Sequence, residues 1–115
     1  MIGADGIRAI LAQYEKYGWQ LRRVLLSSWL RTSLGEEIVS LFASGDVIES
    51  DIDAAWFSRP SRGKSVAWEL RHLNEFPFAL LDVVDPNIDD KDLANVLEQT
   101  EDRLRERINS RKKGH

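Results

Sequence analysis

The stretch that decides the fold is IDAAWFSRPSRGKSVAWELRHLNEFPFALLDVVD, residues 52–85. Apolar residues recur at every second position over three runs, which is the spacing of β-strands. Two polar segments separate the runs. The first contains Pro60 and Gly63, which set φ and permit positive φ in turns, and the second centres on Asn74 and Glu75. We therefore expect three consecutive antiparallel strands.

The two turns also predict how these strands are aligned. Placing Trp56 opposite Trp68 sets Ala54 opposite Leu70, and side chains alternate between the two faces of a sheet. A tight turn at residues 74–75 then adds Ala79, Leu81 and Val83 to the face of Trp68. The opposite face is predicted to mix apolar and charged side chains: Asp53, Phe57, Arg59, Glu69, Arg71, Phe78, Leu80, Asp82 and Val84.

The rest of the chain supplies helices and one further strand. Helical spacing of apolar residues predicts helices over 6–17 and 89–110, and Ser33 with Glu36 has the capping-box spacing that favours a short helix over 34–43. Residues 19–28 fit either a strand or a helix, and we favour the strand. Residues 46–50 are expected to lead into the strand at 52–58. We expect a single α+β domain over 1–115, in the order α-β-α-β-β-β-α. It has an antiparallel sheet of about four strands with helices packed on one face, and 110–115 form a disordered basic tail.

Composition limits the chemistry. The 115 residues include no cysteine, so disulfides, thiolate zinc sites and cysteine nucleophiles are excluded. His72 is the only histidine outside the tail, which excludes a site built from several histidines. A net charge of −3 gives no general attraction for nucleic acid, and no apolar run is long enough for a membrane helix. We expect a cytoplasmic protein with no cofactor, no metal site and no membrane partner.

The mixed sheet face is the predicted binding surface. It has an apolar centre and a charged rim, which is the usual anatomy of a protein interface. The candidate binding residues are Phe57, Arg59, Arg71, Phe78, Leu80 and Val84. We expect a binding domain without intrinsic catalysis that associates with itself, as a homodimer, or with another protein. The alternative is that this face is ordinary core beneath one of the helices.

A catalytic alternative uses three charged residues of the same face. Asp53 is predicted to lie opposite Arg71, with Glu69 close by, and this set resembles the PD-(D/E)xK nuclease pattern, in which carboxylates hold Mg²⁺. The chain departs from that pattern because Arg71 stands where a lysine is expected, and arginine does not readily lose a proton. The simpler interpretation is a cross-strand ion pair between Asp53 and Arg71.

A second alternative is nucleic-acid binding. Several cations are expected near one edge of the sheet, with Trp19 and Phe57 as surfaces on which bases could stack. The cations are Arg22, Arg23, Arg31, Arg59, Arg62, Lys64 and Arg71, and the acids Asp46, Glu49, Asp51 and Asp53 in the same region oppose them.

Overall fold

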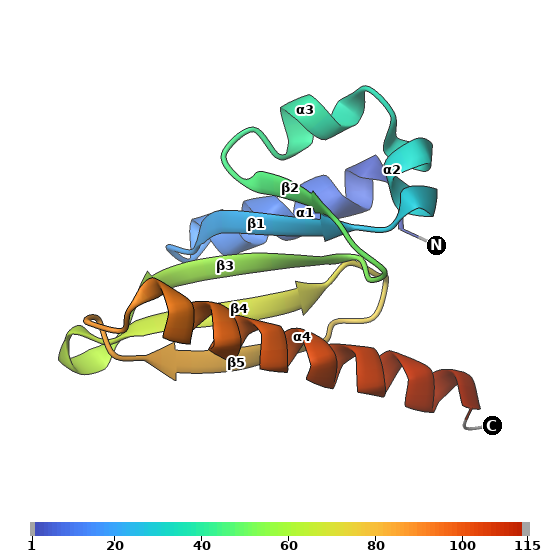
Figure 1. Ribbon diagram of the computed structural model, residues 1–115. Helices are drawn as coiled ribbons and strands as arrows, with labels where there is room; N and C mark the ends of the chain where they lie inside the picture. Colours follow the sequence, from blue (N-terminus) through green and yellow to red (C-terminus); the bar gives the residue numbers. More distant parts are fainter. Residues whose placement is uncertain (1, 114–115) are drawn as a thin grey trace.

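The computed structural model describes residues 2–113, and the side chains of residues 2–110. The strands are β1 (Gln20–Leu26), β2 (Asp46–Glu49), β3 (Ala54–Pro60), β4 (Val66–His72) and β5 (Ala79–Val84). The helices are α1 (Ala4–Lys16), α2 (Ser28–Leu34), α3 (Glu37–Leu41) and α4 (Asp90–Lys113), and a short 3₁₀ helix, η1 (Arg62–Lys64), connects β3 to β4. The strands form one sheet in the order β2-β1-β3-β4-β5 (Figure 1).

The predicted α+β class is confirmed, and the architecture differs from the prediction in three details. The described residues form five strands rather than about four. β2 does not lead into β3 but lies at the far edge, where it pairs parallel with β1, while all other neighbouring strands are antiparallel. Helices cover both faces of the sheet instead of one (Figure 1). The predicted tail begins within α4, and residues 114 and 115 lie outside the described residues.

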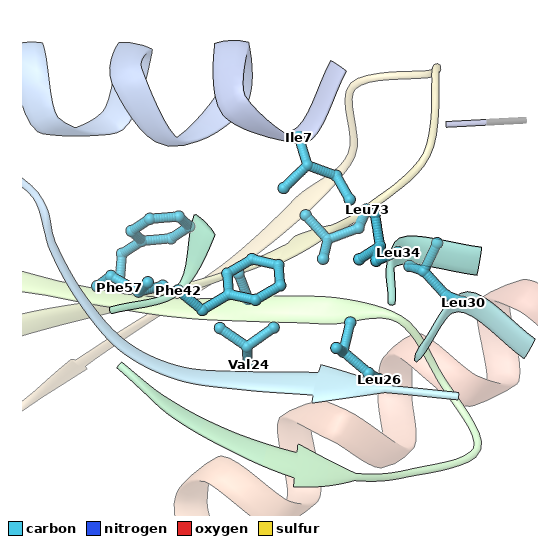
Figure 2. Close-up of a cluster of buried hydrophobic side chains, with 10 residues drawn as sticks. Ile7, Val24, Leu26, Leu30, Leu34, Phe42, Phe57 and Leu73 are labelled. Atoms are coloured by element: carbon cyan, nitrogen blue, oxygen red, sulfur yellow. The ribbon is translucent and has the colours of Figure 1, made fainter. Parts of the chain in front are cut away.

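We call the side covered by α1, α2 and α3 the first face. Its core joins Ile7 of α1 and Leu30 of α2 to Val24 and Phe57 of the sheet, with Phe42 closing the layer after α3 (Figure 2). Residues of β1 and β3, with Leu73 beyond the end of β4, make up the sheet side of this cluster, and no residue of β5 belongs to it. The three helices therefore cover only part of the first face.

The other side, which we call the second face, is covered by α4. Leu97 and Leu104 pack onto Trp56 and Leu70 in a second buried cluster. Two polar contacts fix the helix to the sheet: the Trp56 indole N–H donates to a carboxylate oxygen of Glu101 at 2.8 Å, and Thr100 donates to Asp82 at 2.5 Å. Ala54 to Ser58 are all buried because β3 is sandwiched between the two helical layers.

The predicted alignment of β4 with β5 is wrong by one residue. Leu70 pairs with Leu80 and Glu69 with Leu81, so Leu80 and Val84 share the second face with Trp68, and Leu81 and Val83 take the first face. The cause is the connection between these strands, which is a loop over residues 73–78 rather than a tight turn. It is closed by the His72 N–H donating to the Phe78 carbonyl. A one-residue change exchanges the faces of a whole strand.

The alignment of β3 with β4 differs from the prediction by two residues, which leaves the faces unchanged. Trp56 pairs with Leu70 and Ser58 with Trp68, so the predicted pairing of Trp56 with Trp68 is wrong. The turn between the strands forms where predicted, and Gly63 adopts φ 65° in it. Both faces of this hairpin therefore carry the residues expected of them.

The local sequence pattern predicted α1 and β1 correctly but did not predict α2. The structure confirms the helix predicted over 6–17 and the strand favoured over 19–28. The residues 34–43 form only the short α3, and α2 precedes it. The helix cap in this region is Ser27, whose hydroxyl accepts from the Leu30 N–H at 3.2 Å, so the predicted capping box at Ser33 is wrong.

Candidate functional site

The six predicted binding residues are divided between the two faces. Phe57 is only 1 % exposed and stacks on Tyr14 of α1 with ring centroids 4.0 Å apart, so it belongs to the core of the first face. Leu80 and Phe78 pack with the α4 cluster on the second face, and Arg107 lies 3.8 Å over the Phe78 ring. The alignment of β5 places Val84 on this second face as well. The single predicted surface does not form.

Arg59 and Arg71 remain together on the first face, beside an uncovered part of the sheet. We call this part the open half, formed by Ala67, Glu69, Leu81 and Val83 of β4 and β5. Leu81 and Val83 are 54 % and 58 % exposed. A cavity of about 600 Å³ lies over the open half, bounded on one side by Trp19 and Arg59 and at the end by the β3–β4 connection. Sequence reasoning missed Leu81 and Val83 because it assigned them to the wrong face.

A second cavity, of about 460 Å³, lies between α1 and β4; we call it the α1–β4 pocket. Its lining includes the aromatic rings of Tyr14 and Trp19 and the charged side chains of Glu69, Arg71 and Arg59. The remaining lining residues are Ile10, Gln13, Tyr17 and Pro77. Polar groups and aromatic rings thus line the same space.

Hydrogen bonds hold the walls of this pocket in place. The Tyr14 hydroxyl donates to Glu69 at 2.5 Å, and burial, followed by the nearby carboxylate of Glu69, raises the pKa of Tyr14 above its ordinary value. In the same lining, the Arg59 guanidinium lies 4.3 Å over the Trp19 ring and donates to the Tyr17 carbonyl at 2.7 Å. Tyr14 and Arg59 are therefore already oriented by the fold.

Arg71 is the most unusual side chain of the pocket, because it is 9 % exposed and forms no ion pair with any side chain of residues 2–110. Its hydrogen bond goes to the neighbouring carbonyl of His72. The carboxylate of Glu69, two residues away on the same face, accepts a hydrogen bond from the Tyr14 hydroxyl instead. Burial lowers the pKa of Arg71, and the nearby Tyr14 and Glu69 side chains only partly oppose that effect. Buried arginines are usually paired with an anion.

The predicted catalytic set is not assembled. Asp53 lies at the level of Leu73, whose N–H donates to the Asp53 carbonyl, and Ala55 rather than Asp53 pairs with Arg71. The Asp53 carboxylate accepts from the backbone N–H of Ser27 at 2.7 Å and from its hydroxyl at 3.1 Å, which places it at the start of α2. The predicted ion pair between Asp53 and Arg71 is therefore wrong as well. No group of three acidic or histidine side chains within residues 2–110 is arranged to hold a metal ion.

Four of the predicted cations gather at one end of the sheet. Arg22, Arg59 and Lys64 line one shallow cavity there, and Arg59 and Arg62 line the cavity over the open half. Arg31 lies on α2, beyond the opposite end of β1, and Phe57 is too deeply buried to stack on a base. Nucleic-acid binding by this group stays a prediction.

Comparison with known proteins gives no match: no family model, no curated protein and no solved structure resembles the chain. Within the described part of the chain, no helix combines the length and hydrophobicity needed to cross a membrane.

Proposed function

We propose that the protein is an interaction domain that forms a homodimer through the β5 edge of its sheet, without intrinsic catalysis. The observation that carries the proposal is the exposure of Leu81 and Val83, both more than half accessible, where the open half reaches the edge strand β5. Exposed aliphatic side chains on an unpaired strand edge favour pairing with another strand.

The sequence of β5 supports this proposal because it lacks the features that usually block edge pairing. The strand reads ALLDVV, with no lysine, arginine or proline, and it runs without a bulge along β4. Its one charge, Asp82, faces α4 and accepts from Thr100. The opposite edge, β2, has only four residues and carries Asp46 and Glu49, both exposed. Of the two edge strands of the described sheet, β5 is therefore the one open to pairing.

The partner we favour is a second copy of this chain. In an antiparallel pairing of two β5 strands about a two-fold axis, Leu81 and Val83 of one copy lie beside the same residues of the other. Apolar cross-strand neighbours of this kind stabilise a sheet. The pairing extends one sheet through both copies, and it needs no complementary charge on another molecule.

The experiment is light scattering over a concentration series for the wild type, Leu81→Glu and Val39→Glu. We expect the wild type to reach twice the monomer mass, and Leu81→Glu to remain a folded monomer because a carboxylate on each copy would meet its counterpart across the axis. Val39 is the matched control, since it is equally apolar and even more exposed but lies on α3. Val39→Glu should dimerise like the wild type.

A wild type that stays monomeric at all concentrations would contradict the homodimer. A dimer that Leu81→Glu leaves intact would contradict the β5 edge as its interface. Circular dichroism of each variant shows that the chain is folded.

A further inference from the structure

We propose that the α1–β4 pocket binds a small organic monocarboxylate with an aromatic body, and that Arg71 holds its carboxylate. This site goes beyond the dimer interface and does not depend on it, because Tyr14, Gln13 and Arg71 lie on α1 and β4 rather than on β5.

The anion is inferred from the state of Arg71. A guanidinium has five N–H donors, and in this pocket it is nine-tenths buried with a hydrogen bond to the His72 carbonyl and no ion pair to a carboxylate among the described side chains. An arginine fork matches a carboxylate with two parallel hydrogen bonds. The cavity beside it supplies the space for a ligand that brings such a group.

Glu69 explains why a monocarboxylate is favoured over a phosphate. Its carboxylate accepts from Tyr14 through one oxygen and stays close to the proposed anion site. A second negative charge on the ligand would be repelled by Glu69, whereas a single charge is balanced by Arg71 and by Arg59, which also lines the pocket.

The aromatic body is inferred from the other walls. Tyr14, Tyr17 and Trp19 line the pocket, and the Arg59 guanidinium already lies over the Trp19 ring. Ring faces and a guanidinium plane are good stacking partners for a flat ligand. The volume of about 460 Å³ lies within the range of small-molecule sites.

The probes are 3-phenylpropanoate, its neutral amide and phenyl phosphate, measured by calorimetry and by thermal unfolding. We expect the carboxylate to bind with a Kd on the order of 1 mM and to raise the Tm, because a ligand of this size has limited affinity. The amide and the phosphate should bind at least tenfold more weakly.

Arg71→Met separates a binding role from a structural one. The variant should lose the response to the carboxylate while its own Tm is unchanged or higher, since an unpaired buried charge does not stabilise the fold. Arg103→Met, at an exposed position of α4, is the matched control and should bind like the wild type. Leu81→Glu should also keep the response, which makes failure of this proposal distinct from failure of the dimer.

Two results would overturn the proposal. One is equal binding of the carboxylate and its amide, or no binding of either by the wild type. The other is a marked fall in the Tm of Arg71→Met with the binding response retained, which would make Arg71 a support for the His72 carbonyl only.

Discussion

At the scale of single residues, the contact between Tyr14 and Glu69 links a helix to the sheet across 55 positions of sequence. The Tyr14 hydroxyl donates a hydrogen bond to the Glu69 carboxylate, which is partly buried, so each group satisfies the hydrogen-bonding capacity of the other. Loss of one partner leaves the second without a hydrogen bond, and that costs more than the bond itself contributes. This contact also shapes the α1–β4 pocket, because both residues line it.

We expect Tyr14→Phe to lower the free energy of unfolding by about 1–3 kcal/mol at neutral pH. The pKa of Tyr14 is raised above its ordinary value of 10.0, so its contribution is fully present below pH 10 and is lost as the pH rises further. Denaturant unfolding between neutral and alkaline pH measures both effects. The wild type should lose stability above pH 10, and Tyr14→Phe should show less of this loss. Identical alkaline slopes for the two proteins would contradict the raised pKa.

At the scale of elements, α4 is the helix that makes the second face a core. Leu97 and Leu104 bury one side of it, while Thr100 and Glu101 give their polar atoms to Asp82 and Trp56. Apolar packing supplies most of the stabilisation of such a helix, and the polar contacts fix its position along the sheet.

Leu104→Ala should therefore lower the free energy of unfolding by about 2–5 kcal/mol, because it opens a cavity against Trp56 and Leu70. Glu98→Ala is the control on the exposed side of the same helix and should change stability by less than about 0.5 kcal/mol. Thermal or denaturant unfolding followed by Trp fluorescence measures both. A similar small effect for the two variants would mean that α4 is not part of the cooperative core.

At the scale of the whole molecule, α4 packs over β4 and β5 on the second face, whereas the helices of the first face leave these two strands partly open. Leu80 and Leu81 are neighbours in the chain but lie on these two different faces. Leu80 packs with the α4 cluster, and Leu81 is more than half exposed. Comparing the effect of one substitution on stability at Leu80 and at Leu81 therefore tests the alignment of β5 directly.

We expect Leu80→Glu to lower the free energy of unfolding by about 2 kcal/mol, since it places a carboxylate beneath α4. Leu81→Glu should change the stability of the monomer by no more than about 0.5 kcal/mol. Denaturant unfolding of both variants at low protein concentration, where association is suppressed, makes the comparison. The reverse order of stability would show that β5 is aligned one residue away from the arrangement described above.

Much of the local structure follows from the sequence by itself. The alternation over residues 52–85 predicted three strands and the turn at Gly63, and helical spacing predicted α1 and most of α4, because these signals depend on residues close together in the chain. The candidate site was only partly predictable. Arg59 and Arg71 were recognised as site residues, whereas the roles of Tyr14 and Trp19 depend on contacts between distant segments.

Only the tertiary structure decided which face each residue of β5 takes and which helix covers it. Phe57 and Leu80 are equally apolar in the sequence, and nothing local distinguishes a tight turn at residues 74–75 from the longer loop that forms. The choice is made by burial: α4 can cover Phe78, Leu80 and Val84 together only if β5 is aligned as observed. That alignment leaves Leu81 and Val83 in the open half, while the alignment of β3 with β4 separates Asp53 from Arg71. Local periodicity thus determined the elements, and long-range packing determined the surface on which function is proposed.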